Sequence, residues 1–233
     1  MKFASPLVRG TLIKRYKRFL ADVQLLDGTK VTAHCANSGS MLGVRDPGSP
    51  VWLSPNTNPK AKLPYRWELI EVDGALVGIN TSHPNRIVEE AVLGGAIPEL
   101  AGYDTARREV RYGRNSRIDL MLEGPGTCYV EVKNVTLKRG HEAQFPDAVT
   151  ARGTKHLHEL ADMVAAGHRS VMVYLAQRAD CDRFTIADDI DQAYAAALRT
   201  AVQGGVELLA YQCHMTTDEI RVERPLPIHL ADA

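Results

Sequence analysis

Three charged residues lie inside two short segments that are otherwise apolar enough to be buried. Asp119 interrupts the segment 116–122, while Glu131 and Lys133 interrupt the segment 128–135, and a turn-rich stretch containing Gly and Pro separates the two. Charged side chains are seldom buried without partners, so these three need a chemical explanation. Both segments have the length and composition of strands, and a hairpin between them would place Asp119 beside Glu131.

Two neighbouring carboxylates repel each other, and at least one would be protonated unless a cation lay between them. Mg²⁺ accepts such hard oxygen ligands and retains several waters, and Mn²⁺ is the alternative ion. Because side chains alternate along a strand, Lys133 shares the face of Glu131, where it could orient a water or neutralise charge on a phosphate. An Asp followed on the next strand by Glu-x-Lys is typical of the PD-(D/E)xK active site of restriction-endonuclease-like proteins. The sequence therefore predicts a metal-dependent nuclease site with Asp119 and Glu131 as metal ligands.

Two alternatives accompany this interpretation. Such sites often add a glutamate from the preceding helix, and Glu90 fits that role, although spacing does not separate it cleanly from Glu89. The second alternative has no metal: Asp119, Glu131, Lys133 and Arg117 could form an internal salt-bridge network.

The C-terminal part of the chain, from residue 81 to residue 233, contains the helices and strands that would position this site. An apolar stripe predicts a helix over 85–95, with Pro84 in its first turn, and Thr154 is expected to cap a helix through Ala166. A third helix is expected to begin at Asp188 or Asp189 and to run to about Gln203. The expected strands are 107–112, 117–122, 128–135, 170–176, 206–213 and 219–223. We expect an α/β domain with a mixed central sheet flanked by helices.

Residues 1–80 have a different pattern, with short strands separated by turns. Alternating segments at 7–13 and 19–25 are followed by a hairpin signal at Asp27-Gly28, a strand at 30–36 and a short strand at 51–53. Residues 66–80 predict two more strands, which turn at Asp73-Gly74. So many short strands in one stretch predict a small OB-like β-barrel as a separate N-terminal domain.

The charge of the chain is divided unevenly. Residues 1–66 contain eleven Lys and Arg residues and three acidic residues, a balance of +8, so the remaining chain carries −8 because the total is zero. This asymmetry predicts that the barrel faces a polyanion such as DNA, without sequence preference, although a basic face can also simply be solvated. Tyr16 or Phe19 could stack on bases. The predicted phosphate contacts are Arg9, Lys14, Arg15, Lys17 and Arg18 in the barrel, with Arg152 and Lys155 near a helix start.

The remaining composition limits the class of protein. No apolar run approaches the ~20 residues of a membrane span, and the N-terminal residues have no signal-peptide apolar core. The four cysteines form no C-x-x-C pair, which argues against a structural zinc site and suits a reducing cytoplasm. We therefore expect a cytoplasmic protein without membrane contact. The oligomeric state is not predictable from the sequence.

Several longer segments resemble one family, the sugar fermentation stimulation protein A (SfsA) family. They include "YRWELIEV" (65–72), "VGINTSHPNRIVEEAVL" (77–93), "YVEVKNVTL" (129–137) and "FPDAVTARGTKHLHEL" (145–160), and the resemblance extends over residues 1–230. It implies an N-terminal OB-like domain and a C-terminal nuclease-like domain. It also implies that the helix glutamate is Glu90, and that Asp119, Glu131 and Lys133 occupy the nuclease positions. One departure is Ala36, where the family usually has proline.

Residues and resemblance together predict a DNA-binding protein with a Mg²⁺- or Mn²⁺-dependent phosphodiesterase site. Its catalytic residues would be Glu90, Asp119, Glu131 and Lys133, with the metal held by both strand carboxylates and supported by Glu90. The alternative is a non-catalytic DNA-binding regulator of sugar metabolism genes, because the founding member of the family is described as a non-specific DNA-binding protein that affects maltose metabolism. A carbohydrate-binding barrel is disfavoured, since only 6% of the residues are aromatic.

Overall fold

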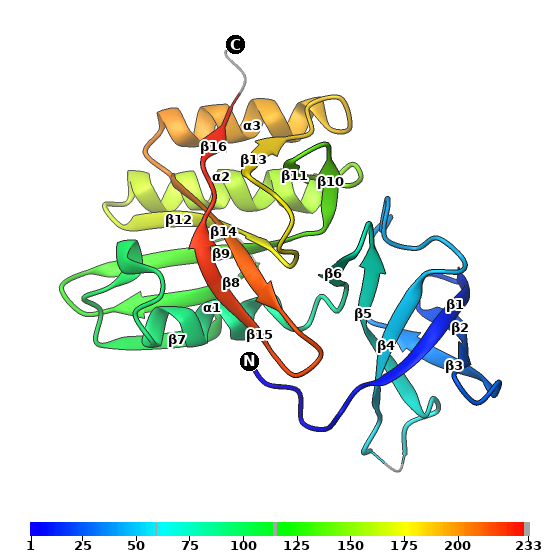
Figure 1. Ribbon diagram of the computed structural model, residues 1–233. Helices are drawn as coiled ribbons and strands as arrows, with labels where there is room; N and C mark the ends of the chain where they lie inside the picture. Colours follow the sequence, from blue (N-terminus) through cyan, green and yellow to red (C-terminus); the bar gives the residue numbers. More distant parts are fainter. Residues whose placement is uncertain (59, 114–115, 231–233) are drawn as a thin grey trace.

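A computed structural model of the chain describes residues 1–58, 60–113 and 116–230. Two parts lie side by side, a β-barrel formed by the first third of the chain and a larger α/β part formed by the rest (Figure 1). No helix in the described ranges is both long enough and apolar enough to cross a membrane. All four cysteines are buried and free.

Five strands close the barrel in the order β1-β2-β3-β5-β4, because β3 and β5 pair in parallel and β4 returns to β1. The apolar side chains that alternate along each strand fill its interior, with Trp67 as the largest. A sixth strand extends from β5 and leads out of the barrel. The strands are β1 (Val8–Tyr16), β2 (Leu20–Leu25), β3 (Lys30–Cys35), β4 (Pro50–Pro55), β5 (Tyr65–Val72) and β6 (Ala75–Gly78).

The α/β part is built on a six-stranded mixed sheet of order β15-β14-β12-β9-β8-β7. The central strands β9, β12 and β14 run parallel, and β12, between the other two, is almost wholly apolar and buried, as expected for a strand covered on both faces. Apolar cores on the two faces hold α1 on one side and α2 and α3 on the other. The strands are β7 (Thr105–Tyr112), β8 (Ser116–Glu123), β9 (Thr127–Val135), β12 (Arg169–Ala176), β14 (Glu207–Met215) and β15 (Ile220–Pro225).

Three α-helices and a short 3-10 helix complete this part: α1 (Pro84–Leu93), η1 (Pro98–Leu100), α2 (Ala151–Ala165) and α3 (Gln192–Gln203). The predicted α/β class with a mixed sheet is confirmed, as is the barrel. Two predicted helix starts are wrong by about one turn. Thr150, not Thr154, caps α2 by accepting from Gly153 N at 3.1 Å, and Asp191, not Asp188 or Asp189, caps α3 by accepting from Tyr194 N at 3.0 Å.

A second, four-stranded sheet was not expected from the sequence. It has the order β10-β11-β13-β16 and consists of β10 (Leu137–Arg139), β11 (Glu142–Phe145), β13 (Arg183–Ile186) and β16 (Ile228–His229). These strands are two to four residues long. Segments this short carry no clear alternation, and although β10 and β11 form a hairpin, the pairings of β13 with β11 and β16 join segments far apart in the chain.

Candidate metal and nucleic-acid site

Two strands and two helices meet at a polar cavity of about 240 Å³ in the α/β part. β8 and β9 contribute the predicted acidic residues and the lysine, α1 contributes its first turn, and α2 contributes two residues one turn apart. The chain between β6 and α1 closes the cavity. Its lining residues are Thr81, Pro84, Asn85, Asp119, Glu131, Val132, Lys133, Asn134, Arg152 and His156, and we call it the carboxylate cavity.

Asp119 is held in place by one bond to each carboxylate oxygen. Asn85 Nδ2 donates to Oδ1 at 2.7 Å, and the backbone N–H of Val132 donates to Oδ2 at 2.8 Å. Burial and, secondarily, the negative charge of Glu131 raise the pKa of Asp119 to about 6. The carboxylate therefore has a fixed orientation and an unfavourable charge state, which a nearby cation would relieve.

Glu131 is only 2% exposed, and its two oxygens have different environments. Oε1 contacts both Lys133 Nζ, at 2.7 Å, and His156 Nδ1, whereas Oε2 is buried with no hydrogen-bond partner among the described residues. Burial favours the neutral acid, but Lys133 and His156 more than offset it and keep the pKa of Glu131 below its usual range. An ionised carboxylate with one unsatisfied buried oxygen is an expected feature of a ligand site.

The first turns of α2 bring two basic groups to the same place. Arg152 and His156 are four residues apart and therefore share one helix face, and Arg152 Nε lies 3.3 Å from His156 Nε2. His156 thus lies between Arg152 and Glu131, while Lys133 Nζ lies 3.3 Å from its other ring nitrogen. The cavity combines two carboxylates with the charged groups of a lysine and an arginine.

The donor set fits a hard divalent cation with few protein ligands. No cluster of three or more His, Cys, Asp or Glu side chains with metal-binding geometry occurs in the part of the chain that the structure describes. Two carboxylates would leave most coordination positions to water or to a phosphate, which is how Mg²⁺ is commonly bound in phosphoryl-transfer sites. A zinc-type site would instead need several nitrogen or sulfur ligands.

The helix glutamates do not join this pair. Glu90 does not line the carboxylate cavity: its carboxylate binds the amino group of Met1 at 2.8 Å and Arg86 Nε at 2.8 Å. The structure thus places the predicted supporting ligand elsewhere, because position 90 is five residues after Asn85 and falls on another side of α1. Glu89, four residues after Asn85, forms an ion pair with Arg108 at 3.2 Å.

The metal-free alternative is also not formed as predicted. Arg117 is exposed and lines a different cavity, so Asp119 has a side-chain amide and a backbone N–H as partners rather than that guanidinium. The Glu131–Lys133 pair does exist.

Sequence reasoning missed two contributors. Asn85 was not considered, although it follows Pro84 in the first turn of α1 and its amide donates to Asp119. Glu109 lies on β7 at the register position opposite Asp119, and Asn85 Nδ2 reaches its Oε1 at 3.3 Å. Its φ of +56° is a left-handed conformation that costs a non-Gly residue energy, and such strain is often found at functional sites.

The predicted DNA-contacting residues divide into two groups. Arg15 is structural, because its Nη2 donates to the carbonyl oxygens of Arg18, Asn37 and Gly39 at 3.0, 2.9 and 2.9 Å. These bonds tie the β1–β2 turn to the barrel loop 37–39. Lys17 and Arg18, with φ of +47° and +64°, form that turn, and both are exposed.

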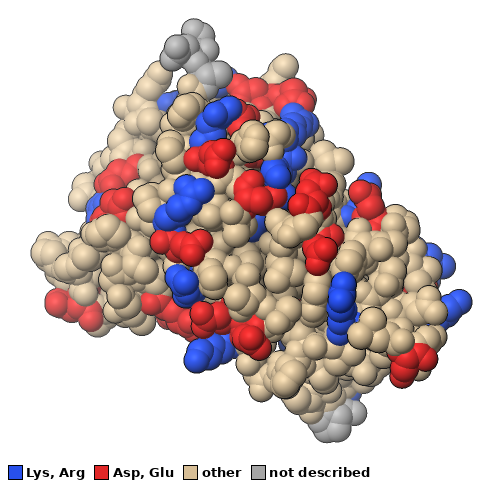
Figure 2. All heavy atoms as spheres, in the orientation of Figure 1, with Lys and Arg blue, Asp and Glu red and all other residues tan. Residues whose placement is uncertain are grey.

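The other residues predicted to contact DNA have surface partners within the protein. Arg9 lies over the Trp52 ring at 5.5 Å, and Lys14 lies 3.7 Å from Asp22 while 61% exposed. Phe19 is 48% exposed and could stack on a base, whereas Tyr16 donates to Asp22 at 3.1 Å. Lys155 pairs with Glu159 at 3.6 Å. On the face shown in Figure 2, acidic and basic side chains are interspersed over the α/β part, and basic side chains project at the outer edge of the barrel.

A second cavity adjoins the first, at the junction of the two parts. It measures about 300 Å³ and shares Thr81 and Asn134 with the carboxylate cavity. Gln177, directly after β12, is buried and donates to Asn134 Oδ1 at 2.7 Å, so it contacts the site through that residue. We call this cavity the junction groove, and its remaining lining residues are Asn37, Ser38, Gly39, Thr136, Leu137, Gln144, Phe145 and Asp147.

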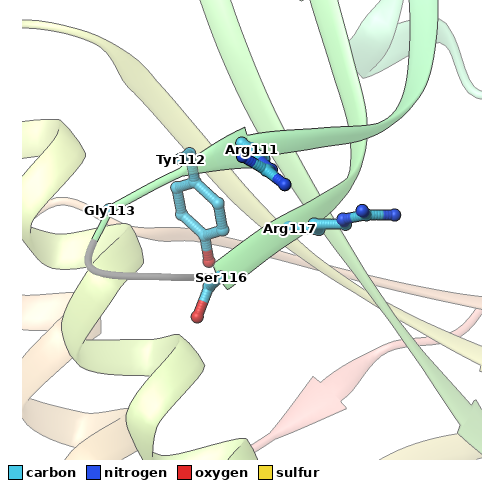
Figure 3. Close-up of a pocket in the computed structure, with 5 residues that line it drawn as sticks. All are labelled: Arg111, Tyr112, Gly113, Ser116 and Arg117. Atoms are coloured by element: carbon cyan, nitrogen blue, oxygen red, sulfur yellow. The ribbon is translucent and has the colours of Figure 1, made fainter.

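A third cavity, of about 480 Å³, lies away from the carboxylates. It lies at the end of the β7–β8 hairpin and is lined by Arg111, Tyr112, Gly113, Ser116 and Arg117 (Figure 3). Arg111 and Arg117 are directly opposite each other in the register, and Figure 3 shows both extending the same way, while the hydroxyls of Tyr112 and Ser116 point elsewhere. Among the described residues, its lining includes none of the predicted metal ligands.

The fold defines a two-domain protein, an OB barrel followed by a larger α/β domain with a mixed sheet. The chain belongs to the SfsA family: residues 13–79 match the family's N-terminal OB domain, and residues 82–219 match the domain described as "Sugar fermentation stimulation protein RE domain". It is 66% identical over 229 residues to a sugar fermentation stimulation protein homolog of Rhodospirillum centenum, covering 97% of this chain and 98% of that protein. A homolog of Paramagnetospirillum magneticum is 62% identical over 100% of this chain and 99% of its own.

A solved structure has the same fold throughout. It is the SfsA of Pyrococcus furiosus in complex with Ca²⁺, which superimposes with a TM-score of 0.90 at 27% identity and covers 98% of both chains.

Proposed function

We propose that this protein binds DNA and hydrolyses its phosphodiester bonds with a divalent cation, Mg²⁺ or Mn²⁺, held by Asp119 and Glu131. The observation that carries this proposal is the buried Oε2 of Glu131, which has no hydrogen-bond partner among the described residues and lies in a cavity that also contains Asp119. The Pyrococcus furiosus relative was solved in complex with Ca²⁺, which supports a divalent-cation site in this protein. Bound there, such a cation would lower the pKa of water and offset negative charge on a phosphate.

The side chains of this protein would position the reacting groups. Asn85 and the Val132 N–H fix the direction of the Asp119 carboxylate, and Lys133 and His156 occupy Glu131 Oε1, which leaves Oε2 for the cation. Arg152 and Lys133 would bind the scissile phosphate, because both carry positive charge on the cavity wall. Lys133 would also stabilise the charge that develops during attack by water.

DNA would reach this cavity over the basic turn of the barrel. Arg15 binds the β1–β2 turn and the loop 37–39 together, so Lys17 and Arg18 lie close to the junction groove. The path that we propose runs from this turn along the groove to the carboxylates. Phosphate contacts of this kind carry no base information, so the binding that they provide is independent of sequence.

A non-catalytic regulator that binds DNA is the second candidate, since the relatives are named for stimulation of sugar fermentation. One observation favours it: Lys133 and His156 already neutralise Glu131, so the pair is compatible with a folded site that never holds a metal.

Cleavage assays distinguish the nuclease from the non-catalytic regulator. The purified protein is incubated with labelled single-stranded and duplex DNA in Mg²⁺, in Mn²⁺ and in chelator, beside a Glu131→Gln variant purified in the same way. Metal-dependent cleavage that the variant lacks supports the nuclease. Cleavage that is equal in both preparations comes from a contaminant, and DNA binding without any cleavage favours the regulator.

A further inference from the structure

The two adjoining cavities differ in the charged groups that line them. The carboxylate cavity contains the cationic groups of Lys133 and Arg152. Among the described residues, the lining of the junction groove includes no lysine or arginine, but it does include the carboxylate of Asp147 and the side-chain amides of Asn37, Asn134 and Gln144. In the first cavity a phosphate would meet two cationic groups beside the carboxylates of Asp119 and Glu131. In the second cavity the charged group among the described lining residues is the carboxylate of Asp147, so a neutral group with hydrogen-bond donors suits it better than a phosphate.

Gln144 offers an acceptor that nothing in the described chain uses. Its Nε2 donates to Glu142 Oε2 at 2.9 Å and to Thr185 Oγ1 at 3.0 Å. Because the carboxylate partner can only accept, the orientation of the amide is fixed, and its Oε1 is left buried without a partner. A buried acceptor without a donor is costly, so a ligand that supplies an N–H at this place would be favoured.

The loop 37–39, which forms one wall of the junction groove, is held in place by residues from both parts of the molecule. Arg15 holds its carbonyls from the barrel, and Asp147 accepts from Ser40 Oγ and Met41 N at 2.9 Å each. Thr81 adds a bond of 2.6 Å to the Ala36 carbonyl. A wall fixed in this way loses little conformational entropy on binding, which is typical of a preorganised ligand site.

We propose that the junction groove binds an unpaired nucleobase next to the phosphate held in the carboxylate cavity, and that it prefers bases with an exocyclic amino group. Gln144 Oε1 and Asp147 would accept from that amino group, and Phe145 supplies an apolar wall. Thymine has no exocyclic amino group and would bind less well. In a duplex the amino groups are occupied in base pairs, so the groove selects single-stranded DNA. This inference deepens the proposed function and rests on it.

The test measures binding in chelator, where cleavage plays no part. We expect fluorescently labelled oligodeoxycytidylate to bind about five- to tenfold more tightly than oligothymidylate of the same length, the effect of one or two hydrogen bonds. Ser38→Trp fills the groove from an exposed position and should reduce this preference to less than about twofold. The matched control is Thr57→Trp, on another exposed barrel loop, which should keep the preference.

The outcomes distinguish a failure of the base-binding groove from a failure of the proposed nuclease function. Equal binding of the two oligonucleotides by the parent overturns the base-binding groove, even if the protein cleaves DNA. A preference that survives Ser38→Trp also overturns it, because the preference then arises elsewhere. If Ser38→Trp does not fold, competition by deoxycytidine monophosphate against thymidine monophosphate on the parent decides the question in the same way. Failure to bind any DNA overturns the proposed function itself.

Discussion

Two buried glutamates, one in each part of the molecule, differ in how completely their oxygens are satisfied. Glu68 on β5 is 4% exposed, and Glu131 on β9 is 2% exposed. Glu68 Oε1 accepts from Ser54 at 2.6 Å, and its Oε2 contacts Asn80 and His83 at 2.8 and 2.7 Å. Glu131 has two partners on one oxygen and none, among the described residues, on the other.

This difference separates a structural carboxylate from a candidate functional one. Glu68 joins the barrel to the segment that enters α1, and its completed network does not require any ligand. Burial opposes its ionisation, yet His83, Ser54 and Asn80 hold the pKa of Glu68 below its usual range. Glu131 is ionised as well, but it lies beside Asp119, whose pKa is raised. A cation between the two carboxylates would complete this second network and relieve their repulsion.

The largest expected effect comes from Lys133. Lys133→Ala should lower the rate of Mg²⁺-dependent DNA cleavage by a factor on the order of 10² or more, because a charge that stabilises the transition state is removed. DNA binding in chelator should change little. Lys138→Ala is the matched control, since Lys138 forms a similar partly buried ion pair, with Asp180 at 2.6 Å, outside the carboxylate cavity. Cleavage rates of the parent and both variants are measured at matched protein concentration. Unchanged cleavage by Lys133→Ala would show that the carboxylate cavity is not the source of the activity.

Glu68→Gln should act on stability instead. We expect a loss of about 2–4 kcal/mol in the free energy of unfolding at pH 7, because the variant leaves His83 and Asn80 without the carboxylate. The folded-state pKa of Glu68 is lowered, so its stabilisation is present above the unfolded pKa near 4.5 and is lost as the pH falls through the folded value. Urea unfolding at pH 7 and pH 4 should therefore show a smaller difference between parent and variant at the lower pH.

Both glutamates give the same signal in the sequence, a charged residue inside an apolar strand, and only Glu131 drew a prediction. The local spacing Glu-x-Lys pointed to Glu131, and strand alternation placed Lys133 on its face, as the 2.7 Å ion pair shows. The partners of Glu68 come from other elements, so no local pattern could distinguish a satisfied carboxylate from an unsatisfied one.

The fold was predictable where periodicity was strong and not where several residues compete for one role. The barrel and the mixed sheet were correctly expected from alternating and apolar segments. The start of α3 was not, because Asp188, Asp189 and Asp191 are all good caps. Tertiary contacts select Asp191, which also accepts from the backbone N–H of Thr150 at 2.7 Å and so links the starts of two helices. The assignment of catalytic and DNA-contacting residues stays a prediction.

Metal binding provides a smaller effect that does not depend on catalysis. Adding Mn²⁺ or Ca²⁺ should stabilise the parent by roughly 1–3 kcal/mol at 10 to 100 times its dissociation constant. Asp119→Asn should abolish this stabilisation, because it removes one of two anionic ligands. Asp180→Asn, which removes a carboxylate outside the carboxylate cavity, should retain it. Thermal unfolding with and without metal measures the difference, and an equal shift in both variants would place the ion elsewhere.

The smallest expected effect concerns the barrel and tests whether its positively charged side chains bind DNA phosphates. Replacing Lys17 and Arg18 by Ala should flatten the dependence of log affinity on log salt by about 0.7 for each phosphate of single-stranded DNA that the variant no longer neutralises. These side chains make no ion pair among the described residues, so thermal stability should be almost unchanged. Arg15→Ala should behave differently, because it removes three bonds to backbone carbonyls and releases the loop 37–39. It should lower stability and, if the junction groove binds a base, abolish the preference for oligodeoxycytidylate. A double variant with an unchanged salt dependence would show that this turn does not bind the phosphates.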